Sequence, residues 1–396
     1  MNGPVRQRSL WQHNLAVVLR HVGAGTPTSR AEVAAATGLT RATVSSLVDD
    51  LLRARLVTEV EPAPRTGAGR PATGLVLSSD GPAGLGLEIN VDFLAAAVVD
   101  LTGAVRHRAV RRVDQRDRAP DRILADVARM AAEAVDAVDP PVAAARLAVP
   151  GLVDADGLVR VAPNLGWRDL DVLGPLRAAA DWPGLPVTAD NEANLGALGE
   201  LAACPSTDFL YVSGEIGIGA GLVLGGTLLR GARGWSGEIG HVTISPDGPV
   251  CRCGARGCLE RYAGQEAVLR AAGIGPDPTL SADAAVTRLA DLAAAGDPAA
   301  LRALHDAGTA LGVAAAGVVN LLDVDTVVLG GSFAALAPWL GSQVEREVRA
   351  RVLTAAWSPV EVRASTLGGA TAVIGAADSV VRDIRTAPAD FVSATR

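Results

Sequence analysis

The sequence predicts a mixed α/β chain in which a small N-terminal winged helix-turn-helix precedes a larger domain of two similar lobes. Three helical patterns followed by two short strands predict the winged head. An order of strand-strand-strand-helix-strand that occurs twice predicts the lobes. The 396 residues, 49% of them hydrophobic, are enough for two or three domains with packed cores. We expect the head at residues 1–80 and the two-lobed domain at 81–396. Lobe one is expected at about 81–190 together with the C-terminal helix, and lobe two at about 191–375.

The head begins with apolar residues at helical spacing from Leu10 to Val22. Ser29 and Glu32 form a capping box that starts a second helix near residue 30, and Gly38 ends it. Thr40 caps a third helix, whose buried stripe is formed by Val44, Leu47, Val48, Leu51 and Leu52. A short helix, a glycine-containing turn and a helix with small polar residues on its outer face are typical of a helix-turn-helix.

The candidate contacts to nucleic acid lie on the outer N-terminal face of the third helix and are Thr40, Arg41, Ala42, Thr43, Ser45 and Ser46. Ala42 is placed to meet a thymine methyl, and Ser45 and Ser46 to bond base edges. The other three lie nearer the phosphates. Strands at 56–60 and 73–77 flank a loop in which Arg70, between Gly69 and Pro71, suits a narrow minor groove.

The charge distribution agrees with this assignment. Residues 1–80 carry a net charge of +3 and the rest of the chain −10. A basic head on an acidic body is typical of a nucleic-acid-binding module attached to another domain. A structural three-helix bundle that binds no DNA is the alternative interpretation of the head.

Residues 236–260 hold three of the four cysteines and one of the five histidines. Cys251, Cys253 and Cys258 stand in a Cys-x-Cys-Gly-x-x-Gly-Cys segment, and His241 is the natural fourth ligand of a tetrahedral Cys₃His zinc site. Because protein side chains fill all four positions, we expect a structural Zn²⁺ that leaves no position for a reactive water. Free cysteines in a loop are the alternative.

The remaining chain is predicted to contain two similar series of strands and helices. Strands are expected at 85–89, 95–100 and 104–113, a helix at 122–138 and a buried strand at 146–149. The second series has strands at 209–213, 220–224 and 227–229, then helices and a buried strand at 326–329. Two such lobes leave a cleft between them, where small ligands usually bind. Carboxylates and amides that could line this cleft suit the neighbouring hydroxyls of a sugar.

Two of these polar residues also have structural interpretations. Asn191 and Glu192 lie between an expected strand at 187–189 and a helix at 193–203. There, asparagine serves as a helix cap and glutamate as an acid that complements the helix dipole. Glu260 taken alone would be a solvated surface residue. The predicted sugar site therefore depends on these polar residues occurring together with residues 236–260, which we call the metal segment.

The Glu-x-Gly-His and Cys-x-Cys-Gly-x-x-Gly-Cys-x-Glu segments resemble those of the ROK family of repressors, open reading frames and sugar kinases. The resemblance covers nearly the whole chain, in the arrangement of the family's winged-helix repressors. It implies an actin/hexokinase-like pair of lobes, with zinc on His241, Cys251, Cys253 and Cys258. It also implies sugar contacts at Gly151, Asn164, Asn191, Glu192, Glu238, His241 and Glu260.

Two departures from the family's kinases indicate a sensor and not an enzyme. Where the kinases have Asp-x-Gly-Gly-Thr, this chain reads Glu88-Ile89-Asn90-Val91-Asp92, without the glycines that let phosphates approach the backbone. Where they have a catalytic aspartate, this chain has Glu192, which we interpret as a vestigial base. A second glycine loop at 213–219 contains Glu215, which would repel a phosphate, so this loop is expected only to support a turn.

The resemblance implies a sugar-responsive repressor that releases operator DNA when a monosaccharide or sugar derivative binds. A homodimer or homotetramer would place two heads on a palindromic operator. An ATP-dependent sugar kinase carrying a DNA-binding head and a ligand-independent DNA- or partner-binding protein are the alternatives.

We expect a cytoplasmic protein, since no secretory signal pattern opens the chain. The uncharged residues 326–344 contain Gly330, Gly331 and Pro338, so a strand, a turn and a helix start are expected there and no membrane segment.

Overall fold

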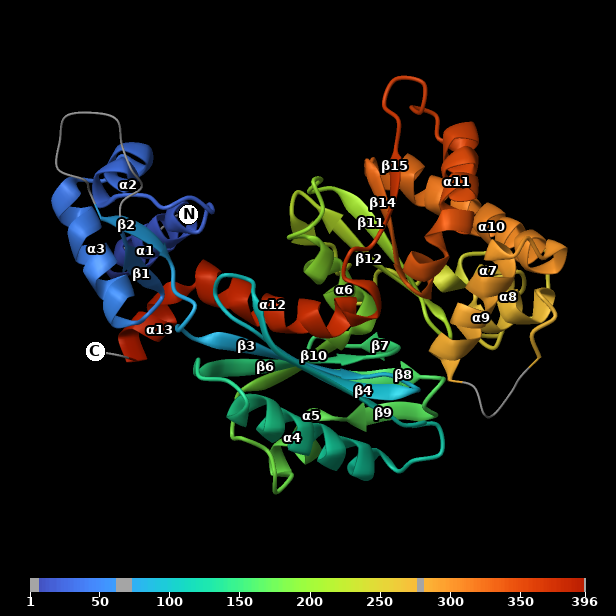
Figure 1. Cartoon of the computed structure of the whole chain (residues 1–396), viewed down its shortest axis with the longest axis horizontal. Helices are drawn as coiled ribbons and strands as arrows, with labels where there is room; N and C mark the ends of the chain where they lie inside the picture. The colour runs from blue at the N-terminus through green and yellow to red at the C-terminus, as the bar shows by residue number, and fades with distance from the viewer. Residues whose placement is uncertain (1–6, 62–72, 276–280, 395–396) are drawn as a thin grey trace.

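The computed structural model describes residues 7–61, 73–275 and 281–394. A helical head lies at one end of the molecule, and two five-stranded sheets with their helices form the rest (Figure 1). This is the mixed α/β fold that the sequence predicts. The loop that would form the wing, including Arg70, lies outside the described residues.

The head consists of α1 (Gln7–Val22), α2 (Arg30–Thr37) and α3 (Arg41–Arg53), followed by the antiparallel strands β1 (Val57–Val60) and β2 (Gly74–Leu77). Ser29 and Glu32 form the predicted capping box at the start of α2. Gly38 ends α2 with φ +72°, a conformation that favours glycine. Local sequence thus determines both ends of α2 and the turn into α3.

The first sheet has the strand order β10-β6-β3-β4-β5. Its strands are β3 (Ala83–Ile89), β4 (Phe93–Val99), β5 (Val105–Arg112), β6 (Val142–Val149) and β10 (Val187–Asn191). The strands β3, β4 and β5 form an antiparallel meander, and β6 and β10 continue the sheet in parallel with β3. The apolar side of α4 (Pro120–Asp136) packs on one face. Figure 1 shows α12 (Thr371–Thr386) on the other.

The second sheet repeats this topology in the order β13-β12-β11-β14-β15. Its strands are β11 (Phe209–Gly214), β12 (Ile218–Leu224), β13 (Thr227–Leu228), β14 (Thr326–Gly331) and β15 (Glu361–Ala364). Again three strands form an antiparallel meander and two continue in parallel. The helices α10 (Pro298–Leu322) and α11 (Ser332–Arg351) share one hydrophobic core with it. The predicted internal repeat is therefore present, although the sequence analysis did not identify β15.

Shorter elements complete the two lobes. Lobe one also contains a three-stranded sheet, which the sequence analysis did not predict, formed by β7 (Leu152–Val153), β8 (Leu158–Ala162) and β9 (Trp167–Asp171) and followed by α5 (Leu173–Ala178). After β10 comes α6 (Glu192–Glu200), which is shorter at its C-terminus than predicted. The metal segment contains a 3-10 helix (Ile239–His241) and leads into α7 (Glu260–Ala263), α8 (Gln265–Ala271) and α9 (Ala282–Ala294). A 3-10 turn (Gly368–Ala370) precedes α12, and α13 (Pro388–Ala394) follows it.

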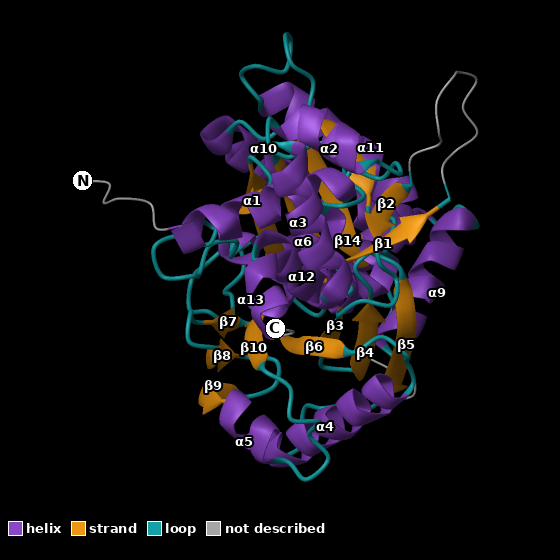
Figure 2. Cartoon of the chain, turned by 90° about the vertical axis from the view of Figure 1, so that its left-hand side faces the viewer, coloured by secondary structure: helices purple, strands orange, loops and turns teal. Residues whose placement is uncertain are grey.

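The helix α12 lies between the lobes and the head. A Cβ at Gly86 would overlap the carbonyl of Val373, and one at Gly375 would overlap the carbonyl of Leu195, so α12 approaches both β3 and α6 backbone to backbone. At its other end, Val381 and Ile384 belong to the same hydrophobic core as the head residues. The helix α13 packs against α1 and α3 beside them (Figure 2).

No helix among the described residues is long and apolar enough to cross a membrane. The uncharged stretch at 326–344 forms β14, a glycine turn and the first part of α11, as its glycines and proline predict.

Candidate functional site

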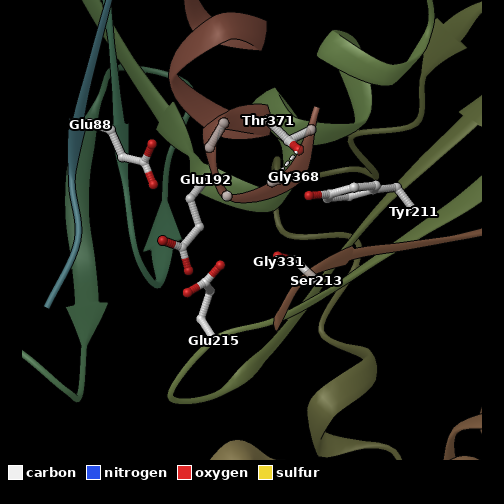
Figure 3. A pocket seen from close by; sticks show the side chains of 10 residues that line it. Glu88, Glu192, Tyr211, Ser213, Glu215, Gly331, Gly368 and Thr371 are labelled. Carbon is white, nitrogen blue, oxygen red and sulfur yellow. Dashed lines mark hydrogen bonds between the residues drawn. The ribbon is translucent and has the colours of Figure 1, made fainter. Parts of the chain in front are cut away.

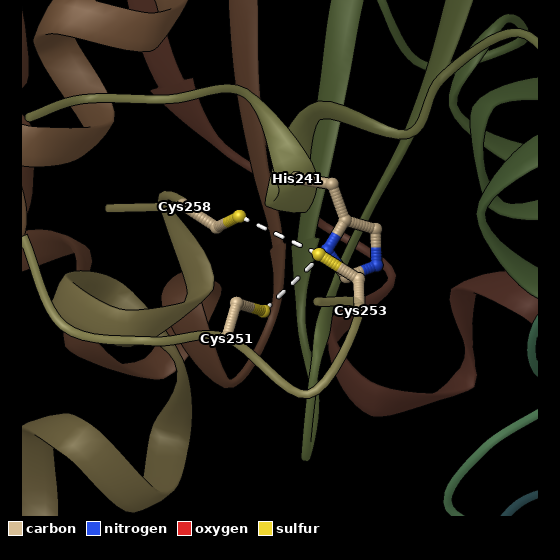
Figure 4. Close-up of side chains that lie close together, drawn as sticks. All are labelled: His241, Cys251, Cys253 and Cys258. Carbon is tan, nitrogen blue, oxygen red and sulfur yellow. Dashed lines mark hydrogen bonds between the residues drawn. The ribbon is translucent and has the colours of Figure 1, made fainter. Parts of the chain in front are cut away.

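The four residues predicted as metal ligands come together in lobe two (Figure 4). The ligand atoms of His241, Cys251, Cys253 and Cys258 all lie within 4.8 Å of one another. Sγ of Cys253 is 3.7 Å from Sγ of Cys258, and Nδ1 of His241 is 3.8 Å from Sγ of Cys251. A tetrahedral zinc with Zn–S bonds of about 2.3 Å gives sulfur–sulfur edges of roughly 3.8 Å, so this donor set fits a zinc ion.

Two glycines let the chain turn around the cluster. Gly254 and Gly257 have φ of +93° and +66°. A Cβ at Gly257 would overlap the carbonyl of Ser245, so these two backbone segments lie too close together for a larger residue at position 257. The backbone N–H of Cys251 donates to the carbonyl of Ala255 at 2.8 Å, which closes the loop between the first two sulfurs.

The N-terminus of α6 brings two of the predicted sugar-site residues together. The Asn191 side-chain amide donates to the carbonyl of Gly151 at 2.7 Å. Its side-chain oxygen accepts from the backbone N–H groups of Ala193 and Asn194, so Asn191 is also the helix cap. The structural interpretation of Asn191 is therefore correct, and Asn191 fixes the position of Gly151 against α6.

The carboxylates connect this end of the cleft to the metal segment. Burial, and then the charge of Glu238, raises the pKa of Glu192 to about 7. Burial also raises the pKa of Glu238, His241 lowers it and Glu260 raises it, so these side chains lie within electrostatic range of one another.

The two remaining predicted sugar-site residues, Asn164 and Glu260, lie beside Gly217. The side chains of Glu260 and Asn164 both approach Gly217, where a Cβ would lie 2.8 Å from Oε2 of Glu260 and 3.9 Å from Nδ2 of Asn164. These two residues also line one hollow between the loop that follows β8 and the helices α7 and α8. The structure thus groups Asn191 with Gly151, and Asn164 with Glu260, and it places Glu238 within electrostatic range of Glu192, His241 and Glu260.

The structure adds two residues to the cleft that the sequence analysis did not assign to it. Glu88, near the end of β3, and Glu215, in the turn between β11 and β12, line a hollow together with Glu192 (Figure 3). The signal in the sequence was the pair of carboxylates at the two positions where phosphate-binding glycine loops would be expected. The sequence alone predicts only a turn at Glu215.

Ion pairs hold the two lobes together beside this cleft. Arg230, which follows β13 in lobe two, bonds Asp190 at the end of β10 at 2.7 Å. Asp190 is itself nearly buried and accepts from the side-chain amide of Asn194 at 3.1 Å. Arg112 of β5 and Asp283 of α9 form a second, more exposed pair between the lobes at 2.7 Å.

The head presents the predicted DNA-contact residues on one face of α3. Thr40, Arg41, Ala42 and Ser46 are exposed, and Thr43 and Ser45 are half-buried. Thr40 accepts from the backbone N–H of Thr43, so its side chain caps α3 as predicted. Arg30 of α2 bonds Asp49 of α3 at 2.8 Å and Glu59 of β1 at 3.1 Å, which orients α3 against the rest of the head.

Comparison with known proteins identifies both parts of the chain. A profile described as the ROK family matches residues 84–383, and one described as the MarR family matches residues 16–67. The chain is 30% identical over 372 residues to the xylose repressor of Bacillus subtilis, an alignment that covers 93% of this chain and 94% of that protein.

Two solved structures share the fold. One is a ROK family transcriptional regulator, a homolog of the E. coli MLC protein, with a TM-score of 0.78 and 24% identity over 97% of this chain and 99% of that one. The other is a ROK family glucokinase from Streptomyces griseus in complex with glucose and AMPPNP. Its TM-score is 0.65 at 27% identity, and the match covers 75% of this chain and 98% of that one. The two named regulators match nearly the whole chain, whereas the glucokinase matches three quarters of it.

Proposed function

This chain belongs to the ROK family, and we propose that it is a sugar-responsive DNA-binding transcriptional repressor, released from its operator by a monosaccharide or sugar derivative. The observation that carries the proposal is that α12 packs in one core with the helix-turn-helix head and also lines, at its other end, the hollow that holds three carboxylates. A relative that aligns over nearly its full length is named a xylose repressor, which supports the same function.

The proposed sugar contacts are Gly151, Asn164, Asn191, Glu192, Glu238, His241 and Glu260. Glu238 and Glu260 would accept hydrogen bonds from adjacent hydroxyls of the sugar, and Asn164 can both donate and accept. Nδ1 of His241 faces Cys251, and Figure 4 shows the second ring nitrogen turned away from the sulfurs. That Nε2–H is then a fixed donor for a sugar oxygen.

The proposed metal is a structural Zn²⁺ on His241, Cys251, Cys253 and Cys258. Zinc would supply no chemistry other than holding these four side chains in a tetrahedral set. The chain's own residues explain why this matters. Glu238 lies three residues before one ligand and Glu260 two residues after another, so the loop that holds the ligands also positions the two carboxylates.

For the head, we propose that residues 1–80 form the DNA-binding domain and 81–396 the sensing domain, with the lobe boundaries given above. Helix α3 would enter the major groove with Ala42, Ser45 and Ser46 at the base edges, and Thr40, Arg41 and Thr43 near the phosphates. Arg70 stays a predicted minor-groove contact. A homodimer or homotetramer would place two heads on an operator with two half-sites.

Sugar binding between the lobes would change their closure, and α12 would carry the change to the head. Thr371 and Ala372 at its N-terminus line the hollow beside Glu192, and Ile384 near its C-terminus packs in the core shared with α1 and α3. We infer that α12, packed at both ends, would shift as one unit when the lobes close. The sugar therefore favours one arrangement of the heads over another.

A sugar kinase with a DNA-binding head is the second candidate, and one observation favours it. Glu192, with its pKa raised to about 7, would suit a general base on a sugar hydroxyl. The carboxylates of Glu88 and Glu215, however, line the hollow where a nucleotide phosphate would need to lie. In a coupled assay of ADP release with neutral, amino and phosphorylated monosaccharides, we expect no turnover above background. Turnover that is lost when Glu192 is replaced would favour the kinase.

The experiment that tests the proposed function is a DNA-binding titration by fluorescence anisotropy at fixed salt. The DNA is selected by the full chain from a random library, and the titration is repeated with a panel of neutral, amino and phosphorylated monosaccharides. We expect one class of sugar to weaken DNA binding by about 5- to 150-fold.

The matched variants are Glu238→Gln and Glu133→Gln. The first should lose the response to sugar and keep its DNA affinity, because it removes a carboxylate from the cleft and leaves the head unchanged. Glu133 is exposed on α4 and pairs only with Arg111 among the described ion pairs, so its variant should respond like the parent. DNA binding that no sugar of the panel changes would overturn the proposal.

A further inference from the structure

The hollow between the two sheets is acidic. It is lined by Glu88, Glu192 and Glu215, and none of the described residues that line it is basic. The three come from different elements: Glu88 from β3, Glu192 from the start of α6 and Glu215 from the hairpin between β11 and β12. Figure 3 shows their carboxylates pointing toward one another.

Two of these carboxylates have an oxygen without a partner. Glu88 is only 4% exposed, and its Oε2 has no hydrogen-bond partner among the described residues. Oε2 of Glu192 is likewise buried and unpartnered in the part of the chain that the structure describes. Asn90, the backbone of Val373 and the more distant charge of Arg108 stabilise the charged form of Glu88 only in part, because its pKa is still raised by burial and by Glu192. A buried carboxylate that is incompletely compensated takes up a proton or binds a cation.

The chemistry of the lining distinguishes this hollow from the cysteine cluster. Carboxylate oxygens are the ligands preferred by hard divalent cations, and the hydroxyl of Ser213 and the backbone of Gly331 offer further oxygens on the same wall. Thiolates and imidazole, in contrast, suit zinc. Two different metals would therefore bind the chain at two separate places.

We propose that the hollow binds one hard divalent cation, Mg²⁺ or Ca²⁺, between Glu88, Glu192 and Glu215, without any nucleotide. The cation takes the place that a nucleotide phosphate would need, because carboxylates line the hollow and the segment after Glu88 has Asn90 and Val91 where the kinases have two glycines. The proposal does not depend on DNA binding or on the identity of the sugar.

The site would connect the two lobes. Glu88 belongs to the first sheet, and Glu215 lies in the turn between two strands of the second, so a cation that both bind stabilises the closed cleft. Glu192 connects the cation to the sugar site through the charge of Glu238. The cation and the sugar are thus expected to strengthen each other's binding.

The test is titration calorimetry and thermal unfolding of the zinc-loaded full chain, dialysed free of divalent cations. MgCl₂ and CaCl₂ are compared with NaCl at matched ionic strength. We expect one site per chain for at least one of the two cations, and an unfolding midpoint that rises with its concentration and not with NaCl.

The variants are Glu215→Gln, which lies outside the proposed sugar and zinc sites, and Glu133→Gln as the matched control. Glu215→Gln should weaken cation binding at least tenfold, and the control should not. Glu88→Gln is the second variant if the first does not fold, and it should have the same effect. The proposal is wrong if neither cation binds the parent, or if Glu215→Gln binds as tightly as the parent. An unfolding midpoint that depends on pH through Glu215 but not on the cations would instead show that the carboxylates share protons.

Discussion

At the scale of single residues, His241 is shared by the proposed metal site and the proposed sugar site. Its Nδ1 lies 3.8 Å from Sγ of Cys251. Burial raises the pKa of Glu238, and the charge of His241 opposes this rise, so the His241 ring lies within electrostatic range of that carboxyl. His241 thus connects the cysteine cluster to the carboxylates of the cleft. Loss of the metal should therefore affect the sugar site before it affects the fold of either lobe.

Replacement of one sulfur tests this connection. Cys253→Ser should lower the zinc content to well below one ion per chain and weaken sugar binding at least tenfold, about 1.4 kcal/mol, because the loop that positions Glu238 and Glu260 is released. Metal analysis and calorimetry measure the two effects. Cys204→Ser is the control, since Cys204 is half-buried and lies outside the cluster. Unchanged sugar affinity in a zinc-free Cys253→Ser protein would contradict the connection.

The acidic hollow predicts how stability depends on pH. Burial, and then the charge of Glu192, raises the pKa of Glu88 to about 8. The pKa of Glu192 is raised to about 7. In the unfolded chain both titrate in the ordinary carboxylate range, so at intermediate pH the folded state holds protons that the unfolded state has released. The stability from these protons is full below the unfolded pKa of about 4.5 and is lost as pH rises through 7 and 8.

In buffer without divalent cations, the free energy of unfolding should therefore fall between about pH 5 and pH 8.5. The slope should reach up to about 1.4 kcal/mol per pH unit for each group. Denaturant unfolding across this range measures the slope. Glu88→Gln should flatten it and Glu133→Gln should not, and parallel slopes in the parent and Glu88→Gln would show that Glu88 does not titrate in this way.

At the scale of elements, α12 is the part on which the coupling depends. Its residue Gly375 packs against α6 so closely that a Cβ would overlap the carbonyl of Leu195 and lie 2.8 Å from the backbone nitrogen of Gly199. Both contacts are with backbone, which cannot move aside without moving the helix. A larger side chain at this position would push α12 away from α6.

Gly375→Ala should therefore destabilise the protein by about 1–3 kcal/mol and reduce the effect of sugar on DNA binding. Gly317→Ala is the matched control, because Gly317 is also inside a helix but a Cβ there meets nothing within 4 Å. That change should be neutral or stabilise by up to about 1 kcal/mol. Denaturant unfolding and the anisotropy titration measure the two effects. Equal outcomes for the two variants would mean that the contact between α12 and α6 carries no coupling.

The elements also show what could be predicted from the sequence. Helix α2 could be predicted to its bounds because Ser29, Glu32 and Gly38 determine its ends locally. The metal cluster could be predicted because its ligands lie within 18 residues of one another along the chain. The strands β7, β8, β9 and β15 were missed because they are short and their pairing depends on contacts within sheets and not on a local pattern.

Glu215 illustrates the same limit within the site. It lies in a tight turn between β11 and β12, where a polar residue is ordinary. Glu215 lies near Glu88 only because the two sheets face each other, and 126 residues lie between them along the chain. No rule based on sequence spacing predicts that two residues so far apart along the chain lie close together in space.

At the scale of the whole molecule, the repeat of one topology in two lobes leaves a cleft that ion pairs bridge at two places. Arg230 with Asp190 and Arg112 with Asp283 each join an element of lobe one to an element of lobe two. The head is not attached by a linker alone, since it shares a hydrophobic core with α12 and α13. Closure of the lobes and orientation of the head are therefore linked through packed elements.

The central claim is that the cleft and the head are in thermodynamic linkage, and calorimetry of the active sugar in the presence and absence of operator DNA tests it most directly. Linkage requires the DNA to weaken sugar binding by the same factor by which the sugar weakens DNA binding, about 5- to 150-fold. An equal sugar affinity for the free and the DNA-bound protein would contradict the account.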